Sequence, residues 1–327
     1  MKIKDEQIID LKNILDNIEN EKKDDVYMGM KKRDFSTEET KTIFKSFLEN
    51  LINKTQPSVF LNEYLKLSIL KKVFPDLYKL TLTIHDPIFH PEKDISGLNT
   101  VWGHTMIALD ISKKLTKMFN LEKHRSLILL LATLLHDIGK PDVTDWEYKR
   151  GRIVVSSPFH DSKGIKKGSA FLKYIGIIDT KMTSTKTLIL SLIKYHHRIY
   201  ELYRNRKVIK LSAISRLKKD MFGYEELLIL LDFADRQSRV TNPLNFTKLD
   251  EVSNWIIKKR NVYLELESKP KPFILGRDLL NLGMTPGKEI GIIVKKFYAS
   301  QLNGAFADKN EALKVLSDYI SCKNHNI

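Results

Sequence analysis

The sequence predicts an all-α fold, and three observations support this class. Apolar residues recur at helical spacing through most of the 327 residues, and strand patterns are nearly absent. Gly151-Arg-Ile-Val-Val-Ser156 predicts at most a short strand pair or an irregular loop. Hydrophobic residues make up 42% of the chain and charged residues 29%, a composition that is typical of folded globular proteins and excludes a disordered chain.

The N-terminal third predicts helices followed by a loop. Apolar residues at near-helical spacing predict a helix over residues 4–23, and the charge density of residues 20–34 predicts a loop or a frayed helix end. Ser36-Thr-Glu-Glu39 has the capping-box pattern that opens a helix, and Pro57-Ser58 opens the next one. Residues 84–99 contain two prolines, a glycine and no periodic pattern, so we expect a loop there.

The stretch from Leu127 to Pro141 is the most informative part of the sequence. A run of nine residues with almost no polar atoms ends in His136-Asp137, and Gly139 and Pro141 are expected to stop the helix. A helix with so few polar residues must be buried on most of its surface. A carboxylate buried beside an imidazole is costly unless a charge compensates it, and a divalent metal ion is the simplest compensator.

The other apolar helices also carry candidate ligands. Thr100 caps a predicted helix that places His104 on its buried side. Apolar periodicity predicts further helices from His160, over residues 183–200 and over residues 224–238. The candidate ligands on these later helices are His160, His196, His197 and Asp235, with Asp232 one turn earlier as the competitor of Asp235.

These positions together favour a metal centre. A lone histidine on an apolar helix face is more often a satisfied core residue than a ligand. Five separate positions of this kind are harder to explain one by one, whereas one or two divalent ions neutralise the carboxylates and bind the imidazoles together. Nitrogen and oxygen ligands without thiolate suit Mn, Fe, Co, Ni, Zn or Mg, and the sequence does not choose among them. His196 and His197 point about 100° apart on a helix, so we expect one to bind metal and leave open which.

The charge of the chain favours a polyanionic partner. The formal net charge is +15, which suits RNA, DNA, nucleotides or an acidic lipid surface, although a general richness in lysine explains part of it. The segment Lys194–Lys219 interleaves basic residues, Arg198 among them, with Tyr195, Tyr200 and Tyr203. Basic residues can follow a phosphate backbone while aromatic rings stack on unpaired bases. A solvated helix–loop surface is the alternative that the sequence leaves open.

The linker Glu267-Ser-Lys-Pro-Lys-Pro272 is the best candidate for a domain boundary. We therefore expect an N-terminal helical extension over residues 1–56, a main helical domain over residues 57–266 and a C-terminal helical module over residues 267–327. A single cysteine excludes an intrachain disulfide. With no apolar leader and no apolar run near the ~20 residues that cross a bilayer, the protein is expected to be cytoplasmic and to avoid membranes. The oligomeric state is left open.

The ordered set of His104, His136-Asp137 and Asp235 resembles the HD phosphohydrolase superfamily, whose motif is a histidine, a His-Asp pair and a distant aspartate. In members with two metals, extra histidines fall between the His-Asp pair and the last aspartate, where this chain has His160 and His196-His197. The resemblance implies one ion at His104, His136, Asp137 and Asp235. It implies a second ion at His160 and His196 or His197, with Asp137 as the bridge.

A closer resemblance links the segments Pro57–Leu77, Phe89–Asp94, Phe159–Gly164 and Pro272–Gly291 to bacterial CCA-adding enzymes and poly(A) polymerases. The nucleotidyltransferase head of those enzymes, with its glycine turn and Asp-x-Asp pair, has no counterpart in residues 1–56, so we expect no nucleotide addition. The resemblance implies instead the hydrolysis of 2′,3′-cyclic phosphates and phosphomonoesters at RNA ends, with tRNA among the substrates, or of nucleotides.

Asp137 and Lys140 are the expected catalytic residues, and Lys140, Arg198 and Arg236 are the expected substrate contacts. Lys140 lies just past a helix end, where it can pair with a phosphate or complement the helix dipole. Arg236 can contact a phosphate or pair with a nearby carboxylate. Two other functions stay open. One is a non-catalytic tRNA- or RNA-binding protein with a structural metal, and the other is a phosphohydrolase of free signalling or deoxynucleotides.

Overall fold

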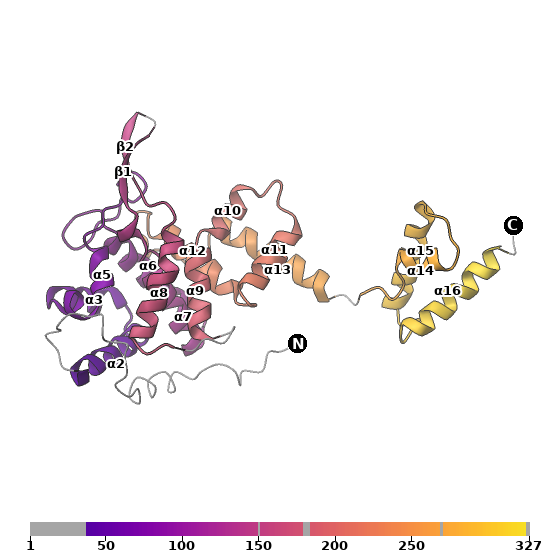
Figure 1. Cartoon of the computed structure of the whole chain (residues 1–327), viewed down its shortest axis with the longest axis horizontal. Coiled ribbons are helices and arrows are strands. Elements are labelled where there is room, and N and C mark those ends of the chain that lie inside the picture. Colours follow the sequence, from indigo (N-terminus) through magenta and orange to yellow (C-terminus); the bar gives the residue numbers. More distant parts are fainter. Residues whose placement is uncertain (1–36, 150, 179–183, 269–270, 325–327) are drawn as a thin grey trace. The chain divides into compact units, whose positions relative to one another are not determined.

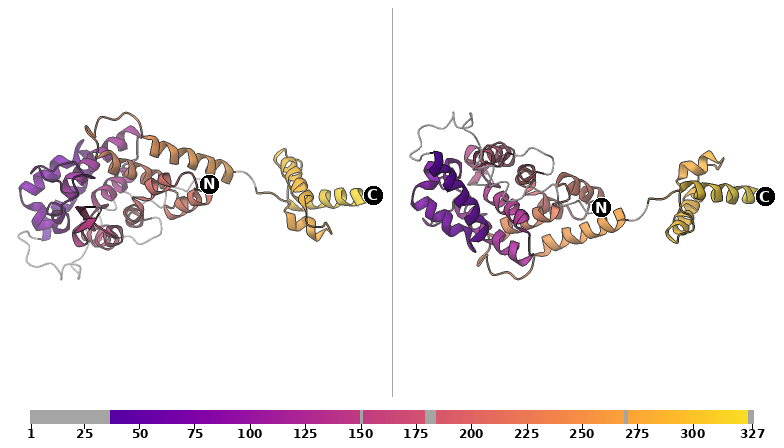
Figure 2. Two further views of the ribbon diagram at one scale, coloured as in Figure 1. Left: turned by 90° about the horizontal axis from the view of Figure 1, so that it is seen from above. Right: turned by 90° about the horizontal axis from the view of Figure 1, so that it is seen from below.

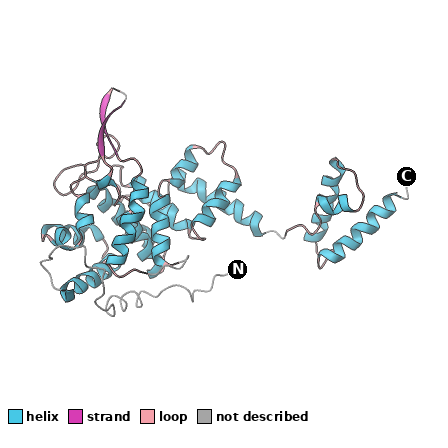
Figure 3. Cartoon of the chain, viewed as in Figure 1, coloured by secondary structure: helices cyan, strands magenta, loops and turns pink. Residues whose placement is uncertain are grey.

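The computed structural model, shown in Figure 1, describes residues 37–149, 151–178, 184–268 and 271–324. These residues form helices and one two-stranded sheet, so the predicted all-α class is confirmed (Figure 3). The helix expected over residues 4–23 and the loop over residues 20–34 lie outside the described residues. By their contacts, the chain divides into two compact units, Met1–Arg260 and Asn261–Ile327.

The first unit begins with the helices α2 (Thr37–Asn53), α3 (Pro57–Lys66), α4 (Ile69–Val73) and α5 (Pro75–Leu80). The ligand-bearing part then contains α6 (Val101–Met118), α7 (Lys123–Leu135), the 3-10 turn η2 (Lys140–Asp142), α8 (His160–Tyr174), α9 (Thr185–Tyr195), α10 (Arg198–Arg204), α11 (Leu211–Asp220) and α12 (Glu225–Gln237). An antiparallel hairpin, β1 (Asp145–Lys149) and β2 (Arg152–Ser156), lies between η2 and α8. Helix α13 (Glu251–Ser268) crosses the division between the units.

Helix α7 is the centre of the first unit, because every residue from Ser126 to Leu135 is buried. It contacts α6, α9, α12 and α2, and a helix with neighbours on so many sides has no polar face. Helix α2 contributes buried Phe47, Leu48 and Leu51 to this core and lies with α3 to α5 among the indigo and purple helices of Figure 2. Residues 37–53 of the expected N-terminal extension therefore pack within this unit. The three-part domain division stays a prediction.

The loop before α6 is fixed to the first turn of that helix. As the sequence predicts, Thr100 caps α6: its hydroxyl accepts a hydrogen bond from the Gly103 N–H and donates one to Asp94 Oδ2 at 2.7 Å. A Cβ atom on Gly103 would lie 2.7 Å from the backbone nitrogen of Asp94, so only glycine allows so close an approach. Asn99 Nδ2 donates to the carbonyl of Glu92 at 2.9 Å. The loop therefore holds Glu92 beside α6.

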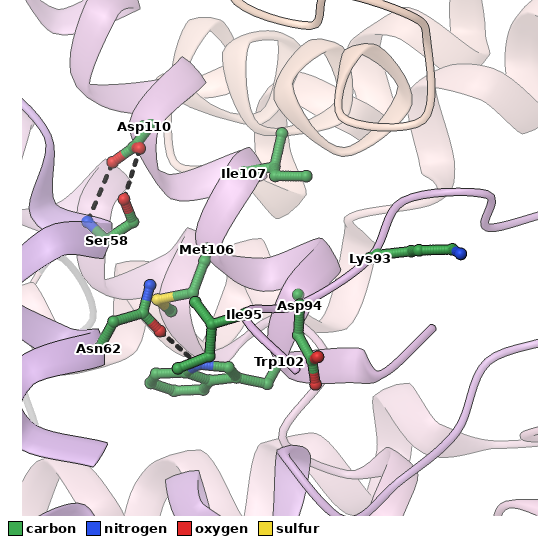
Figure 4. Close-up of a pocket in the computed structure, with 10 residues that line it drawn as sticks. Ser58, Asn62, Lys93, Asp94, Ile95, Trp102, Met106, Ile107 and Asp110 are labelled. Atoms are coloured by element: carbon green, nitrogen blue, oxygen red, sulfur yellow. Dashed lines mark hydrogen bonds between the residues drawn. The ribbon is translucent and has the colours of Figure 1, made fainter. Parts of the chain in front are cut away.

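Polar contacts also fix α6 against α3 (Figure 4). Asp110 accepts hydrogen bonds from the backbone N–H of Ser58 at 3.0 Å and from its hydroxyl at 2.6 Å. The fully buried Trp102 donates its indole N–H to Asn62 Oδ1 at 2.9 Å. Since these contacts set the rotation of α6 about its axis, they also set the direction of His104, two residues after Trp102.

The second unit contains α14 (Gly276–Asn281), α15 (Lys288–Leu302) and α16 (Lys309–Asn324). Its core consists of Ile274, Leu279, Ile293, Phe297, Ala312, Leu316 and Ile320. Among the described helices of the chain, none is long and apolar enough to cross a membrane.

Candidate metal centre

Five elements bring the predicted ligands together at one end of the α6–α12 bundle. His104 lies in the first turn of α6, and His136 and Asp137 follow the last residue of α7. The first residue of α8 is His160. His196 and His197 lie between α9 and α10, and Asp235 is in the last turn of α12. Helix ends leave polar backbone groups and side chains together, so an end-on arrangement of apolar helices concentrates these ligands at one place.

The first ligand group consists of His104, His136 and Asp235, all of which are buried. One ligand atom from each lies within 4.8 Å of the others. Asp235 Oδ1 is 2.9 Å from His104 Nε2 and 3.9 Å from His136 Nε2. Atoms that each lie about 2.0–2.2 Å from one ion are separated by about 3–4 Å, so this spacing suits a shared divalent metal.

The second ligand group consists of His160, His196 and His197. His160 Nε2 lies 3.3 Å from the Nε2 atoms of both other rings. His196 is fully buried, whereas His197 is exposed. Both rings therefore reach the same point, and the sequence-based expectation that only one of them faces the centre does not describe their geometry. Both residues keep right-handed helical backbone angles, yet their ring centroids lie only 3.8 Å apart, so the side-chain rotamers bring the two rings together.

Asp137 lies between the two groups. Its Oδ2 atom is 3.3 Å from His136 Nε2, and its Oδ1 atom is 3.4 Å from His160 Nε2. The carboxylate thus has one oxygen toward each group, the arrangement that the predicted bridging role requires. His136 Nε2 and Asp137 Oδ1 are buried and make no hydrogen bond within the part of the chain that the structure describes. Buried polar atoms without partners are costly, and a divalent cation would satisfy both of them.

The backbone fixes the tautomers of three histidines. Carbonyl oxygens accept hydrogen bonds from Nδ1 of His136 (Thr133 O, 2.7 Å), His160 (Ser157 O, 2.8 Å) and His196 (Ile193 O, 2.6 Å). A carbonyl only accepts, so each Nδ1 carries the proton and each Nε2 in the neutral ring presents a lone pair to the centre. This is the state in which imidazole binds a metal.

Electrostatics favour neutral rings at His160 and His196. At His136 burial is outweighed by the carboxylates of Asp137 and Asp235, which raise the pKa of that ring, so a bound cation would have to displace its proton. Burial lowers the pKa of His196 well below its usual value and also lowers the pKa of His160, which keeps both rings neutral. Burial by itself raises the pKa of Asp137, but nearby His136 and Lys140 outweigh it and hold that pKa well below its usual value. Asp235 behaves in the same way, with Arg239 and His104 as the opposing groups. The carboxylates are therefore ionised.

Gly139 is required by a close approach of helix α8. The sequence-based interpretation of Gly139 as a helix stop is only part of the reason, because its φ is −81° and any residue adopts that angle. A Cβ atom at this position would lie 2.0 Å from the carbonyl oxygen of His160 and 2.5 Å from the nitrogen of Gly164. The absence of a side chain thus allows the start of α8 to place His160 against Asp137.

The three predicted cationic contacts have different positions. Lys140 is buried with its Nζ atom 2.7 Å from Asp137 Oδ2, so it belongs to the centre. Arg236 instead pairs with Asp232 at 2.8 Å and with Asp250, which is the carboxylate pairing that the sequence left open. The Arg198 guanidinium lies 3.3 Å from Glu201. The substrate roles of these residues stay predictions.

Four further residues border the centre. Arg239 lies one helical turn after Asp235 and contacts its Oδ1 atom at 2.6 Å. His85 Nε2 is 2.9 Å from Lys140 Nζ. His85, His90 and Glu92 form a third potential ligand group, and Glu92 Oε1 accepts from Nδ1 of His90 at 2.7 Å and of His104 at 2.6 Å. His90 and Glu92 precede His104 in a loop, so the sequence left their roles open, and it gave no signal for His85 or Arg239.

A pocket of about 220 Å³ opens beside the second group. Its lining includes His85, Phe89, Lys140, His160, His197 and Arg239. Cationic and imidazole groups dominate this lining, so the pocket suits an anion that reaches the metal ligands from solvent.

Residues 101–239 match the family model of the HD domain. The matched segment contains all seven predicted ligands, from His104 to Asp235. The match covers less than half of the chain and shows that this segment is similar to the HD domain, a family that consists in general of metal-dependent hydrolases. The domain implies a metal-dependent phosphohydrolase, and the histidine and aspartate groups can hold the divalent metal. No curated protein matches the chain.

Proposed function

We propose that the protein is a metal-dependent phosphohydrolase of RNA ends, which removes 2′,3′-cyclic phosphates or terminal phosphomonoesters. The observation that carries the proposal is the position of Asp137 between two ligand groups, beside a pocket lined by Lys140 and Arg239. The ligands for one or two divalent ions would be His104, His136, Asp137 and Asp235 on one side and His160, His196 and His197 on the other. When bound, such ions supply Lewis-acid polarisation of a phosphoryl group.

Lys140 and Arg239 would hold the substrate phosphate. Each now pairs with a ligand carboxylate, Lys140 with Asp137 and Arg239 with Asp235. Cations that neutralise these carboxylates would release the ammonium and the guanidinium for a phosphate, with a point charge from Lys140 and a planar fork of donors from Arg239. Asp137 would stay ionised beside Lys140 and would contact both ligand groups, one with each carboxylate oxygen.

RNA is the proposed substrate for two reasons that lie outside the centre. The formal charge of +15 favours a long polyanion over a small nucleotide. The segments that flank the centre resemble those of bacterial CCA-adding enzymes, which act on tRNA. The same centre on a chain without RNA affinity would be a phosphohydrolase of free nucleotides.

A panel of metals and phosphoesters tests the proposal. The purified protein with Ni, Mn or Co is expected to open an RNA 2′,3′-cyclic phosphate or release a terminal phosphate, and excess EDTA is expected to abolish turnover. Metal content and product are measured on the same preparation. Tight tRNA binding without turnover under any metal would contradict the proposal and support a binding protein with a structural metal. Preference for free nucleotides with a weak salt dependence would support the nucleotide hydrolase.

Exchange of Arg239 for glutamine is expected to raise the KM for an RNA end by about tenfold, because a charge-assisted hydrogen bond contributes about 1.5–3 kcal/mol. Arg277→Gln is the matched control, because Arg277 is an exposed arginine of α14 with no predicted role in the site. Its KM is expected to stay within about twofold. An equal rise in both variants would indicate a general loss of positive charge and not a contact at Arg239. An unchanged KM in Arg239→Gln would remove Arg239 from the phosphate site.

A further inference from the structure

The β1–β2 hairpin exposes one apolar face. In its register Trp146 pairs with Val155, and Tyr148 pairs with Ile153. Cross-strand partners and residues two apart on one strand share a face, so these four side chains form a single surface, the hairpin face. Trp146, Tyr148 and Ile153 are 63%, 76% and 64% exposed. A contiguous exposed patch of this kind usually marks a binding surface.

The other face of the hairpin carries one apolar residue, Val154, among polar residues that pair with one another. Ser156 donates to Glu147 Oε1 at 2.6 Å, and Lys149 also pairs with Glu147. The exposed apolar side chains of the hairpin are thus concentrated on the hairpin face. Figure 1 shows the hairpin projecting beyond the helices of its unit, so helices do not cover the hairpin face.

Contacts at both ends of the hairpin, at Arg152 next to the turn and at its base, hold it beside the centre. Arg152 pairs with Asp86 at 2.9 Å, and its guanidinium lies 5.5 Å from the centre of the Phe89 ring. The hydroxyls of Thr144 and Ser157 form a hydrogen bond of 2.7 Å across the base of the hairpin. The ion pair and this hydrogen bond fix the direction of the hairpin relative to the pocket.

The hairpin face continues into the pocket. Val155 belongs to the face and also lines the pocket, together with Lys140 and Arg239. Phe89 lines the pocket as well and is 61% exposed. Phe159, directly before His160, is 79% exposed and has a φ of 58°, a strained angle for a bulky residue. One exposed aromatic ring, Phe89, thus lines the pocket, and a second, Phe159, directly precedes the ligand His160.

We propose that the hairpin face stacks against unpaired bases next to the phosphate that is hydrolysed. The inference rests on the proposed function and narrows its substrate to a single-stranded nucleic-acid end. Every base has a stacking face, so an aromatic surface binds single strands with little sequence preference. The adjoining Lys140 and Arg239 match the phosphate of the same strand. This charge beside the aromatic face, in a chain with a net charge of +15, favours a polyanion over a protein partner.

Tryptophan fluorescence tests the contact directly. Trp102 is buried and Trp255 is half-buried, so Trp146 is the tryptophan most open to a ligand. A single-stranded RNA oligonucleotide with a 3′-hydroxyl end, added to the metal-loaded protein, is expected to quench the fluorescence emission of Trp146. Trp146→Phe is expected to abolish the quenching yet keep the affinity, measured by anisotropy of a labelled oligonucleotide. Trp146→Ala and Tyr148→Ala are each expected to weaken binding by about tenfold.

Kinetics separate the hairpin face from the chemistry. Trp146→Ala is expected to raise the KM for RNA ending in a 2′,3′-cyclic phosphate by about tenfold, while hydrolysis of bis(p-nitrophenyl) phosphate stays within about twofold. Val154→Ala, on β2 and on the opposite face of the hairpin, is the control and is expected to change neither. Equal losses on both substrates would overturn the inference, because they indicate damage to the centre.

Failure of the inference and failure of the proposed function can be told apart. Metal-dependent RNA hydrolysis with an unchanged KM in Trp146→Ala would contradict the inference and support the proposed function. If RNA quenches the Trp146 fluorescence but no hydrolysis occurs, the contact with RNA is supported and the proposed function is contradicted. A dimer that Trp146→Ala dissociates, with no effect on RNA binding, would assign the face to a second copy of the chain and overturn the inference.

Discussion

Replacement of Asp137 by asparagine is expected to lower metal-dependent hydrolysis by at least about a hundredfold. Loss of even a residue that only hydrogen-bonds to a metal ligand costs up to about that factor, and Asp137 lies within 3.4 Å of ligand atoms in both groups. The amide has nearly the shape of the carboxylate but lacks its charge. Bound metal, measured by mass spectrometry after dialysis, is expected to fall with the activity.

The matched control is Asp142→Asn. Asp142 lies two residues after Lys140 in η2 and pairs with Lys167 at 2.6 Å, on the outside of the centre. Its exchange makes the same chemical change and is expected to leave metal content and turnover within about twofold, since exposed ion pairs contribute little. Full activity of Asp137→Asn with unchanged metal would show that the centre lies elsewhere.

Exchange of Gly139 for alanine is expected to be the most destabilising single-methyl addition near the centre. The new Cβ atom would lie 2.0 Å from a backbone oxygen of α8, and backbone cannot move aside as a flexible side chain can. Overpacking of this kind costs about 3 kcal/mol at the upper end of the usual range. The melting temperature, followed by circular dichroism, is then expected to fall by about 6–12 °C.

Gly139→Ala also has an effect that a purely structural glycine would not produce. If the first turn of α8 moves away, His160 leaves Asp137, and the second ligand group loses metal before the first. The metal content per protein is therefore expected to fall in two steps, first at the second ligand group and then at the first. Gly291→Ala is the control, because a Cβ atom at that helical position meets nothing within 4 Å. It is expected to be neutral or to stabilise by up to about 1 kcal/mol. A melting temperature for Gly139→Ala within about 1 °C of the parent would contradict the close approach.

The positions of the candidate ligands could be predicted because a polar, ionisable residue occurs at each of them where the helical pattern calls for a buried apolar one. His104, His136 and Asp235 lie in or directly after helices whose other residues are mostly buried, and a charged or imidazole group there needs a partner. That conflict is local and visible in the sequence. Some helix boundaries were also visible, as Thr100 shows for the start of α6, whereas the helix expected over residues 183–200 ends at Tyr195.

Long-range contacts were not visible in the same way. Even the two local i,i+4 pairs, Arg239 with Asp235 and Arg236 with Asp232, do not show by their spacing which arginine borders the pocket. Glu92 reaches His104 only because the loop before α6 folds back against Gly103. The apolar face of the hairpin depends on strand register, which the short segment from 151 to 156 did not define.

By itself the sequence determined the all-α class and which imidazoles and carboxylates are candidate metal ligands, because burial and helical spacing act between residues close together in the chain. The tertiary structure alone decided that these ligands form two groups with Asp137 between them, that both His196 and His197 reach the second group, and that Arg239 borders the pocket. These features depend on how helix ends distant in the chain are oriented toward one another, and the spacing of residues along a single helix does not specify that orientation.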